Sequence, residues 1–158
     1  MKTILLSLGL VFAGLPFLKA DDPKAGYHGM AGPSGGRLLV EMEPHVEFFV
    51  NDARKVEIRF VGLANIVIAP GEQEVSVVIG EGAKAATLTF TKAGDKLVSD
   101  QPVPAGNDLP VVVQIYAKAG AKPVTESFKL NLTPCPAGKH PQYACICEAA
   151  KHKKPEQK

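Results

Sequence analysis

The amino-acid sequence predicts an all-β protein, a single antiparallel, Ig-like β-sandwich of about seven or eight short strands. Two observations support this fold class. Apolar and polar residues alternate with a period of two through most of residues 37–132, and 15 glycines and 13 prolines interrupt the 158-residue chain at short intervals. Apolar residues at helical spacing do not occur over any length, and the chain has the size of one domain.

The period-two segments can be followed in order along residues 37–132. In the clearest of them, Val56, Ile58 and Phe60 alternate with charged residues, as expected of a strand with one buried face. Proline, glycine, asparagine or aspartate stands between most segments and marks the turns. The expected strands cover residues 38–42, 46–50, 55–60, 66–68, 75–79, 86–91, 97–98, 111–115 and 128–132.

The apolar side of these strands predicts one shared core. Val, Ile, Leu and Phe supply it in sufficient number for an independently folding domain over residues 37–132. The expected members of the core are Val56, Ile58, Phe60, Val75, Val77, Ile79, Leu88, Phe90, Val113, Ile115, Phe128 and Leu130.

Residues 1–20 have the layout of a secretory signal peptide. Lys2 supplies a positive charge, an apolar run extends to Leu18, and Ala20 precedes two acidic residues, so we expect cleavage after Ala20. A transmembrane anchor is the alternative, but a helical span needs roughly 20 apolar residues and this run is shorter. We therefore expect a periplasmic or secreted bacterial protein without a membrane span after cleavage.

Residues 21–36 are rich in glycine and proline and lack apolar periodicity, so we expect a flexible leader. Cleavage after the signal would remove Lys2 and Lys19, which leaves 16 basic against 16 acidic residues and no net charge. A neutral chain without a basic stripe has no electrostatic reason to bind nucleic acid, and that class of function is excluded.

All three cysteines lie in residues 133–158, a Cys-rich segment that we expect to end in a basic, disordered tail. In an exported protein they predict a disulfide from Cys135 to either Cys145 or Cys147. One thiol is then left over, and it could link two chains into a dimer. The disulfide would close a loop of about ten residues after the last strand.

The same cysteines have the chemistry of a soft-metal site. Cys145 and Cys147 are two residues apart, so on an extended strand their thiolates face the same way, which suits Cu(I) or Zn(II). Cys135 and His140 would complete a set of three thiolates and one imidazole. Thiol redox chemistry is a third reading, although the chain has no Cys-x-x-Cys motif.

His45 and Glu47 form a second, weaker metal candidate, because residues i and i+2 of a strand project from one face. The alternative is a solvated strand face opposite Val46, Phe48 and Val50. The sequence contains no Gly-x-Ser-x-Gly, no His-Glu-x-x-His and no phosphate-binding glycine loop, so we expect the protein not to be an enzyme.

Several short stretches carry a resemblance to a known family. They are residues 35–37 (GGR), 45–50 (HVEFFV), 55–60 (KVEIRF), 94–99 (GDKLVS), 111–116 and 128–132. Their order resembles the small N-terminal β-domain of periplasmic adaptor proteins of heavy-metal efflux pumps. The resemblance implies a β-domain, a role in metal handling and an envelope partner such as an efflux-pump component. The lipoyl-like, hairpin and barrel parts of those adaptors have no counterpart here, so we expect that the chain does not bridge a pump by itself.

The stretch YACICE, residues 143–148, resembles the end of a group of uncharacterised secreted bacterial proteins. Their pattern carries a further cysteine near the position of Gly138, which implies that His140 is the only nearby substitute ligand here. Together these features predict an exported, non-enzymatic binding module for a soft metal ion, Cu(I) or Zn. The alternatives are a structural or partner-binding envelope module with a disulfide staple and, more distantly, a thiol-redox protein.

Overall fold

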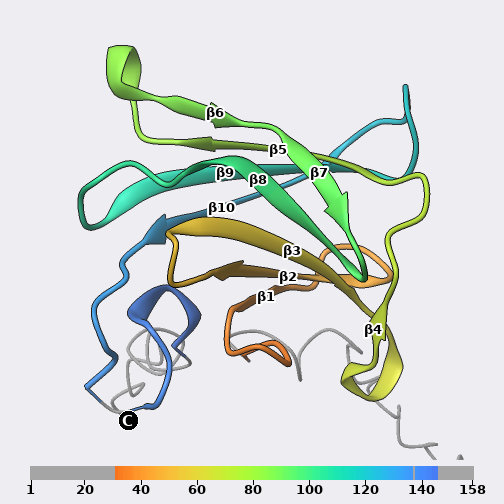
Figure 1. Cartoon of the computed structure of the whole chain (residues 1–158), viewed down its shortest axis with the longest axis horizontal. Coiled ribbons are helices and arrows are strands. Elements are labelled where there is room, and N and C mark those ends of the chain that lie inside the picture. The colour runs from red at the N-terminus through yellow and green to blue at the C-terminus, as the bar shows by residue number, and fades with distance from the viewer. Residues whose placement is uncertain (1–30, 137, 146–158) are drawn as a thin grey trace, which may run out of the picture.

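A computed structural model describes residues 31–136 and 138–145 of the chain. These residues form ten β-strands and three short 3-10 helices, and the strands make two antiparallel sheets that face each other (Figure 1). The predicted all-β sandwich is confirmed, with more strands than the sequence indicated. Within this part of the chain, no helix has the length and apolar character needed to cross a bilayer.

Sheet A contains six strands in the order β1-β2-β3-β8-β7, and β4 pairs with the end of β3. Its strands are β1 (Arg37–Leu39), β2 (His45–Val50), β3 (Lys55–Val61), β4 (Val67–Ile68), β7 (Phe90–Ala93) and β8 (Lys96–Pro102). Sheet B has the order β10-β9-β5-β6. Its strands are β5 (Glu74–Ile79), β6 (Ala86–Leu88), β9 (Leu109–Tyr116) and β10 (Val124–Leu130).

The core lies between the two sheets and confirms the predicted set. Nine of the twelve predicted residues are buried in one cluster, and Val75, Phe90 and Phe128 pack against it while partly exposed. In β3, for example, Val56, Ile58 and Phe60 are fully buried, because alternate residues of a strand point to the same face. Buried members outside the predicted set are Leu39, Val46, Phe48, Leu97, Val103, Val111, Tyr143 and Ala144.

One alternating segment of the sequence, residues 86–91, contributes residues to a strand in each of the two sheets. Its first part is β6, which pairs with β5 of sheet B, and the chain then crosses at Thr89 to become β7, which pairs with β8 of sheet A (Figure 1). Thr89 is held at the crossing by Asp100, whose backbone N–H and side chain hydrogen bond to the Thr89 backbone. Leu88 before the crossing is buried in the core, and Phe90 after it packs against the same core while partly exposed. The alternation of apolar and polar residues therefore continues through the crossing and does not reveal it.

The described structure continues beyond residues 37–132 at both ends. Residues 31–36, assigned from the sequence to the flexible leader, form a hydrogen-bonded turn in which Gly32 N–H donates to the Gly36 carbonyl over 2.8 Å. At the other end, the sandwich does not stop at residue 132, because Tyr143 returns to the core. Residues 1–30 and 146–158, which include the expected signal peptide and basic tail, lie outside the described residues.

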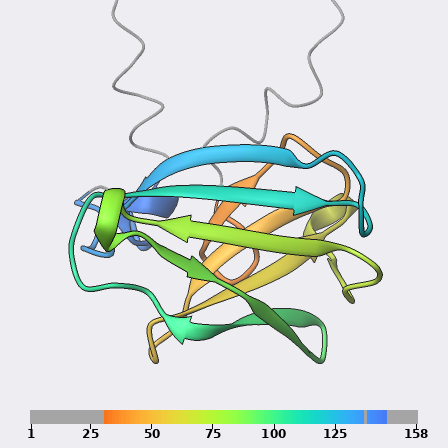
Figure 2. The same ribbon diagram turned by 90° about the horizontal axis from the view of Figure 1, so that it is seen from above.

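Strand β10 forms one margin of sheet B, and among the described strands it pairs only with β9 (Figure 2). The start of sheet A lies against its side chains. The Arg37 guanidinium lies 4.9 Å from the centre of the Phe128 ring, and Glu41 N–H donates to Glu126 Oε1 over 3.2 Å. β1 and β10 therefore meet at the same side of the sandwich.

Candidate functional site

The predicted Cys-rich segment contains a disulfide between Cys135 and Cys145, whose Cα atoms are 6.2 Å apart. The sequence left Cys145 and Cys147 open as partners of Cys135, and the structure selects Cys145. The loop is closed next to the disulfide by a bridge between Pro134 and Pro141. Cys147 lies outside the described residues. Of the four proposed soft-metal ligands, two are thus joined to each other through their sulfur atoms.

His140 lies in the same loop, but its ring is placed against the turn at Gly35. A Cβ atom added to Gly35 would come within 2.8 Å of His140 Nδ1, and Gly35 has a positive φ of 87° that favours glycine. The His140 carbonyl accepts a hydrogen bond from Cys135 N–H over 3.0 Å. Among residues 31–136 and 138–145, no group of three or more His, Cys, Asp or Glu side chains is placed to hold a metal ion.

Tyr143 is the largest fully buried side chain that the structure describes, at 2% exposure. Its ring lies 6.0 Å from that of Phe48 and 6.5 Å from that of Phe128, and its hydroxyl accepts a hydrogen bond from Val50 N–H over 3.0 Å. Burial and the nearby charge of Glu47 raise the pKa of Tyr143 to about 12, although the Val50 N–H opposes this shift. The disulfide loop therefore places the aromatic ring of Tyr143 in the core.

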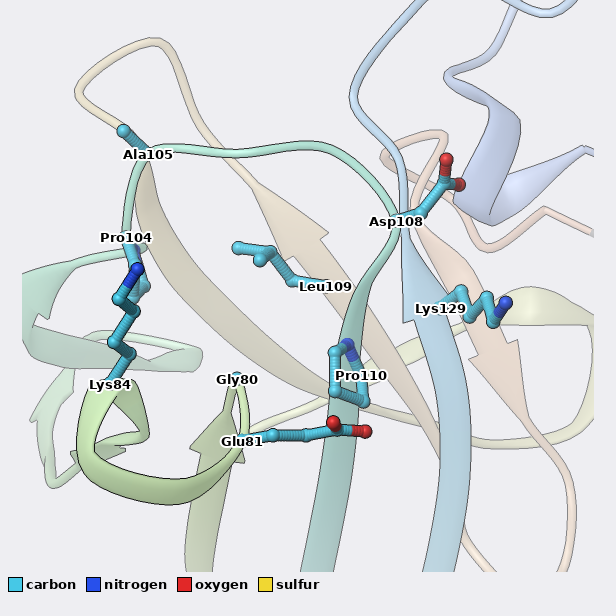
Figure 3. Close-up of a pocket in the computed structure, with 9 residues that line it drawn as sticks. All are labelled: Gly80, Glu81, Lys84, Pro104, Ala105, Asp108, Leu109, Pro110 and Lys129. Atoms are coloured by element: carbon cyan, nitrogen blue, oxygen red, sulfur yellow. The ribbon is translucent and has the colours of Figure 1, made fainter.

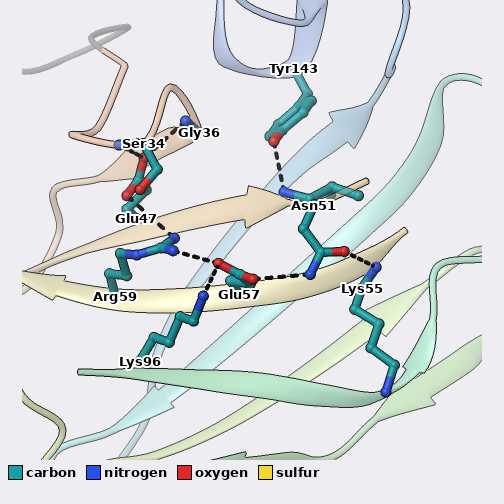
Figure 4. A network of polar contacts seen from close by, with 10 residues as sticks. Ser34, Gly36, Glu47, Asn51, Lys55, Glu57, Arg59, Lys96 and Tyr143 are labelled. Atoms are coloured by element: carbon teal, nitrogen blue, oxygen red, sulfur yellow. Dashed lines mark hydrogen bonds and ion pairs between the residues drawn. The ribbon is translucent and has the colours of Figure 1, made fainter. Parts of the chain in front are cut away.

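Among the described residues, His45 and Glu47, the second metal candidate, lie neither in a metal site nor on a solvated strand face, the two environments that the sequence suggested. Both side chains are buried, so the solvated strand face is wrong. Glu47 is covered by the turn 31–36, which folds over this end of β2. Glu47 Oε1 accepts hydrogen bonds from the backbone N–H groups of Ser34 and Gly36 over 2.8 and 2.9 Å (Figure 4).

His45 has nearby partners of its own. His45 Nδ1 lies 3.0 Å from the Met42 carbonyl, and its Nε2 lies 3.5 Å from Glu43 Oε1. The two predicted metal ligands are therefore engaged by different neighbours, and the described residues bring no third ligand to them.

Arg59 joins Glu47 to a second buried carboxylate, Glu57, on the outer face of sheet A (Figure 4). Glu47 and Arg59 are directly opposite each other in the pairing of β2 with β3, with 4.0 Å between Glu47 Oε2 and Arg59 Nη1. Glu57 is also bound by Lys96 Nζ over 2.9 Å and by Asn51 Nδ2 over 3.0 Å. Opposite charges in cross-strand positions stabilise a sheet, so we assign this network a structural role.

The environment of Glu57 lowers the pKa of its carboxyl group. Burial alone would raise this pKa, but hydrogen bonds from Asn51, Lys96 and Arg59, together with the charge of Arg59, outweigh it. A lowered pKa in the folded state means that the ionised carboxylate favours folding. The network therefore contributes stability at neutral pH.

We expect the stability of the domain to depend on Glu57 in the acid range. The contribution is complete above the ordinary carboxyl pKa of 4.5 and is lost as pH falls through the lowered folded-state value. The melting temperature of the wild type should therefore fall more steeply below about pH 4.5 than that of Glu57→Gln, as measured by circular dichroism. The exposed Glu72→Gln variant is the control and should follow the wild type. Parallel curves for the wild type and Glu57→Gln would contradict the assigned role.

A hollow of about 420 Å³ lies at one end of sheet B, between the β5–β6 connection and the start of β9 (Figure 3). Its rim carries two acidic and two basic side chains, and all four are exposed, so it does not select a cation over an anion. Asp108 is already bound by Asn131 Nδ2 over 2.9 Å. The lining residues are Gly80, Glu81, Lys84, Pro104, Ala105, Asp108, Leu109, Pro110 and Lys129.

An exposed apolar tip, defined here as residues 63–68, was missed by the sequence reasoning. Its three large apolar side chains, Leu63, Ile66 and Ile68, are 83%, 65% and 44% exposed. A signal was present, because residues 60–71 contain no charged side chain in a chain that is 22% charged. The expected strand over residues 66–68 is present as β4, but the apolar side chains around it are exposed.

Comparison with known proteins gives no family for this chain. No protein-family model matches it, and neither a curated protein nor a solved structure is significantly similar to it. The resemblance of its short motifs to efflux-pump adaptors therefore stays a prediction.

Proposed function

We propose that this chain is an exported, non-enzymatic partner-binding module in which the Cys135–Cys145 disulfide is a structural staple. One observation carries the proposal: the disulfide closes the loop that places Tyr143 in the core. Within this loop only a one-turn 3-10 helix, Gln142–Ala144, and a single β-bridge order the described residues, and a crosslink limits the freedom of the unfolded chain. This favours the staple among the uses that the sequence allowed for the cysteines.

The remaining parts of the proposal have separate support. Structural disulfides persist in oxidising compartments, which agrees with the signal peptide predicted over residues 1–20. Glu47 and Glu57, the two buried carboxylates among the described residues, are engaged by backbone N–H groups or cations, a use that stabilises the fold. A binding role without chemistry is consistent with this arrangement.

Soft-metal binding remains the competing function. It requires Cys145 and Cys147 as thiolates, with Cys135 or His140 completing the site, and the sulfur atoms of a disulfide have no thiolate charge to donate to Cu(I) or Zn(II). The staple and the metal site therefore cannot exist in the same molecule at the same time, and the redox state of the Cys135–Cys145 pair separates them.

We expect the Cys135→Ser/Cys145→Ser variant to lose about 3 kcal/mol of unfolding free energy, measured by urea denaturation of the oxidised protein. Reductant should destabilise the wild type to a similar extent and leave the variant unchanged. Cys147→Ser is the matched control and should keep the stability of the wild type. Thiol counting on the oxidised protein should find one free thiol per chain, that of Cys147, in line with the Cys135–Cys145 pairing.

The outcome that would overturn the staple is tight metal binding. Reduced wild type, Cys145→Ser and Cys147→Ser would be titrated with Cu(I) and Zn(II) against a competing chelator. Stoichiometric binding in the wild type that is lost in both variants would replace the staple with a metal site. Equal weak binding in all three proteins is the expected result.

A further inference from the structure

The apolar tip protrudes from the sandwich at the end of β3 (Figure 1). It begins with a short 3-10 turn, Leu63–Asn65, and continues into β4. Leu63, Ile66 and Ile68 are the only large apolar side chains that are exposed among residues 31–136 and 138–145. Single exposed apolar residues are common on protein surfaces, but a contiguous group on a projection is typical of an interaction site.

The conformation of the tip is fixed by its backbone. Gly62 N–H donates to the Ile66 carbonyl over 2.8 Å, and β4 pairs with β3 through Val67 and Ile68. Ala64 and Asn65 both have positive φ angles, 56° and 58°. They are the two central residues of the turn that reverses the chain between β3 and β4, in which Ile66 N–H donates to the Leu63 carbonyl over 3.3 Å. The tip is thus a hydrogen-bonded, pre-shaped projection.

The chemistry of the tip narrows the class of occupant. Membrane-surface anchors combine apolar side chains with aromatic residues and with lysine or arginine. Residues 61–71 contain apolar side chains but no aromatic residue, lysine or arginine. A symmetric pair of tips would bury only roughly a few hundred Å² on each copy, whereas a stable dimer needs about 800 Å² per partner. A convex, uncharged projection buries its side chains best in an apolar concavity, where no charge of the partner is left unpaired.

We propose that the apolar tip docks into an uncharged, concave apolar pocket on a different protein, with Leu63 and Ile66 as the anchoring side chains. This inference rests on the proposed function as a partner-binding module and names the surface that would do the binding. The Cys135–Cys145 staple takes no part in it, so the two proposals can fail separately.

The first experiment is site-specific photocrosslinking with the full chain in the cells that produce it. Benzoylphenylalanine is placed at position 63, and the control carries it at Ala83, in the exposed 3-10 turn Gly82–Lys84 at the β5–β6 connection. We expect a discrete crosslinked protein from position 63 and none from position 83. The absence of a crosslink specific to position 63 would overturn the proposal.

The second experiment measures affinity with the crosslinked protein once it has been identified and purified. Leu63→Ser/Ile66→Ser should weaken binding by about thirtyfold or more, as is typical when central anchors are removed. Ala83→Ser should bind as the wild type does. Leu63 and Ile66 are exposed, so the variant should keep the melting temperature of the wild type. Equal affinity of the tip variant and the wild type would overturn the tip as the docking surface but leave the binding module in place.

Two further measurements test the other occupants. Sedimentation velocity of the chain alone would reveal self-association, and flotation with vesicles of phosphatidylethanolamine and phosphatidylglycerol would reveal membrane binding. Either activity, if lost in Leu63→Ser/Ile66→Ser and kept in Ala83→Ser, would overturn the proposal in favour of a second copy or a lipid surface. Metal binding without any protein partner would instead overturn the proposed function itself.

Discussion

Replacing Tyr143 with alanine is expected to lower the free energy of unfolding by about 3–5 kcal/mol, enough to unfold much of a small domain. The ring is fully buried against Phe48 and Phe128, so its removal leaves a cavity that the rigid sheets cannot fill. Urea denaturation followed by circular dichroism measures the loss. The half-buried Tyr116→Ala on β9 is the comparison and should cost clearly less. A loss of less than about 1 kcal/mol for Tyr143→Ala would place the disulfide loop outside the core.

Tyr143→Phe separates the hydroxyl from the ring. The variant keeps the packing but leaves the partly buried Val50 N–H without its acceptor, which costs about 1 kcal/mol. Because the folded-state pKa of Tyr143 is raised to about 12, its contribution is complete below the ordinary value of 10.0. It is lost as pH rises through the folded-state value. We expect the wild type to lose stability in this alkaline range, and Tyr143→Phe to lose less.

Arg59→Met should destabilise the fold by about 3–5 kcal/mol, because it leaves a buried charge without its partner. Glu47 is fully buried, and with Arg59 removed it keeps only the two backbone N–H groups of the 31–36 turn. Glu57 would lose one of its two cations and keep Lys96. Chemical denaturation at neutral pH measures the change.

The double variant Glu47→Gln/Arg59→Met distinguishes lost pairing from lost packing. A neutral amide at position 47 can still accept the hydrogen bonds from Ser34 and Gly36 but carries no charge, so most of the stability should return. Arg54→Met, at an exposed arginine whose guanidinium donates to the Pro104 carbonyl, is the control and should change stability little. No recovery in the double variant would show that the methylene packing of Arg59, and not its charge, is what counts.

The fold was predictable because alternation reports burial directly. In β3 and β9 every second side chain meets the opposite sheet, and these strands match the expected segments closely. The crossing at Thr89 was not predictable, since a strand that changes sheets keeps the same alternation as one that does not. The two-residue strand β4 was predictable as part of residues 66–68, but the apolar run around it did not indicate that Leu63, Ile66 and Ile68 would be exposed.

The candidate sites show the same limit of local patterns. The period of two correctly placed His45 and Glu47 on one face of β2, but it could not indicate that residues 31–36 would fold over that face. Cysteine spacing allowed two partners for Cys135, and the choice of Cys145 depends on the path of the loop in space. Tyr143 stands alone in a segment without periodicity, so nothing nearby in the sequence marks it as a core residue.

The margin of sheet B has a consequence for how this protein behaves at high concentration. A seven-residue strand such as β10, paired on one side by the described strands, is a template on which another chain can add and start an aggregate. Here an arriving strand would have to displace the contacts that Arg37 and Glu41 make with Phe128 and Glu126. It would also strip water from the exposed Lys129. The segment from β1 to Glu41 thus protects the folded state against strand-by-strand aggregation, in addition to placing Leu39 in the core.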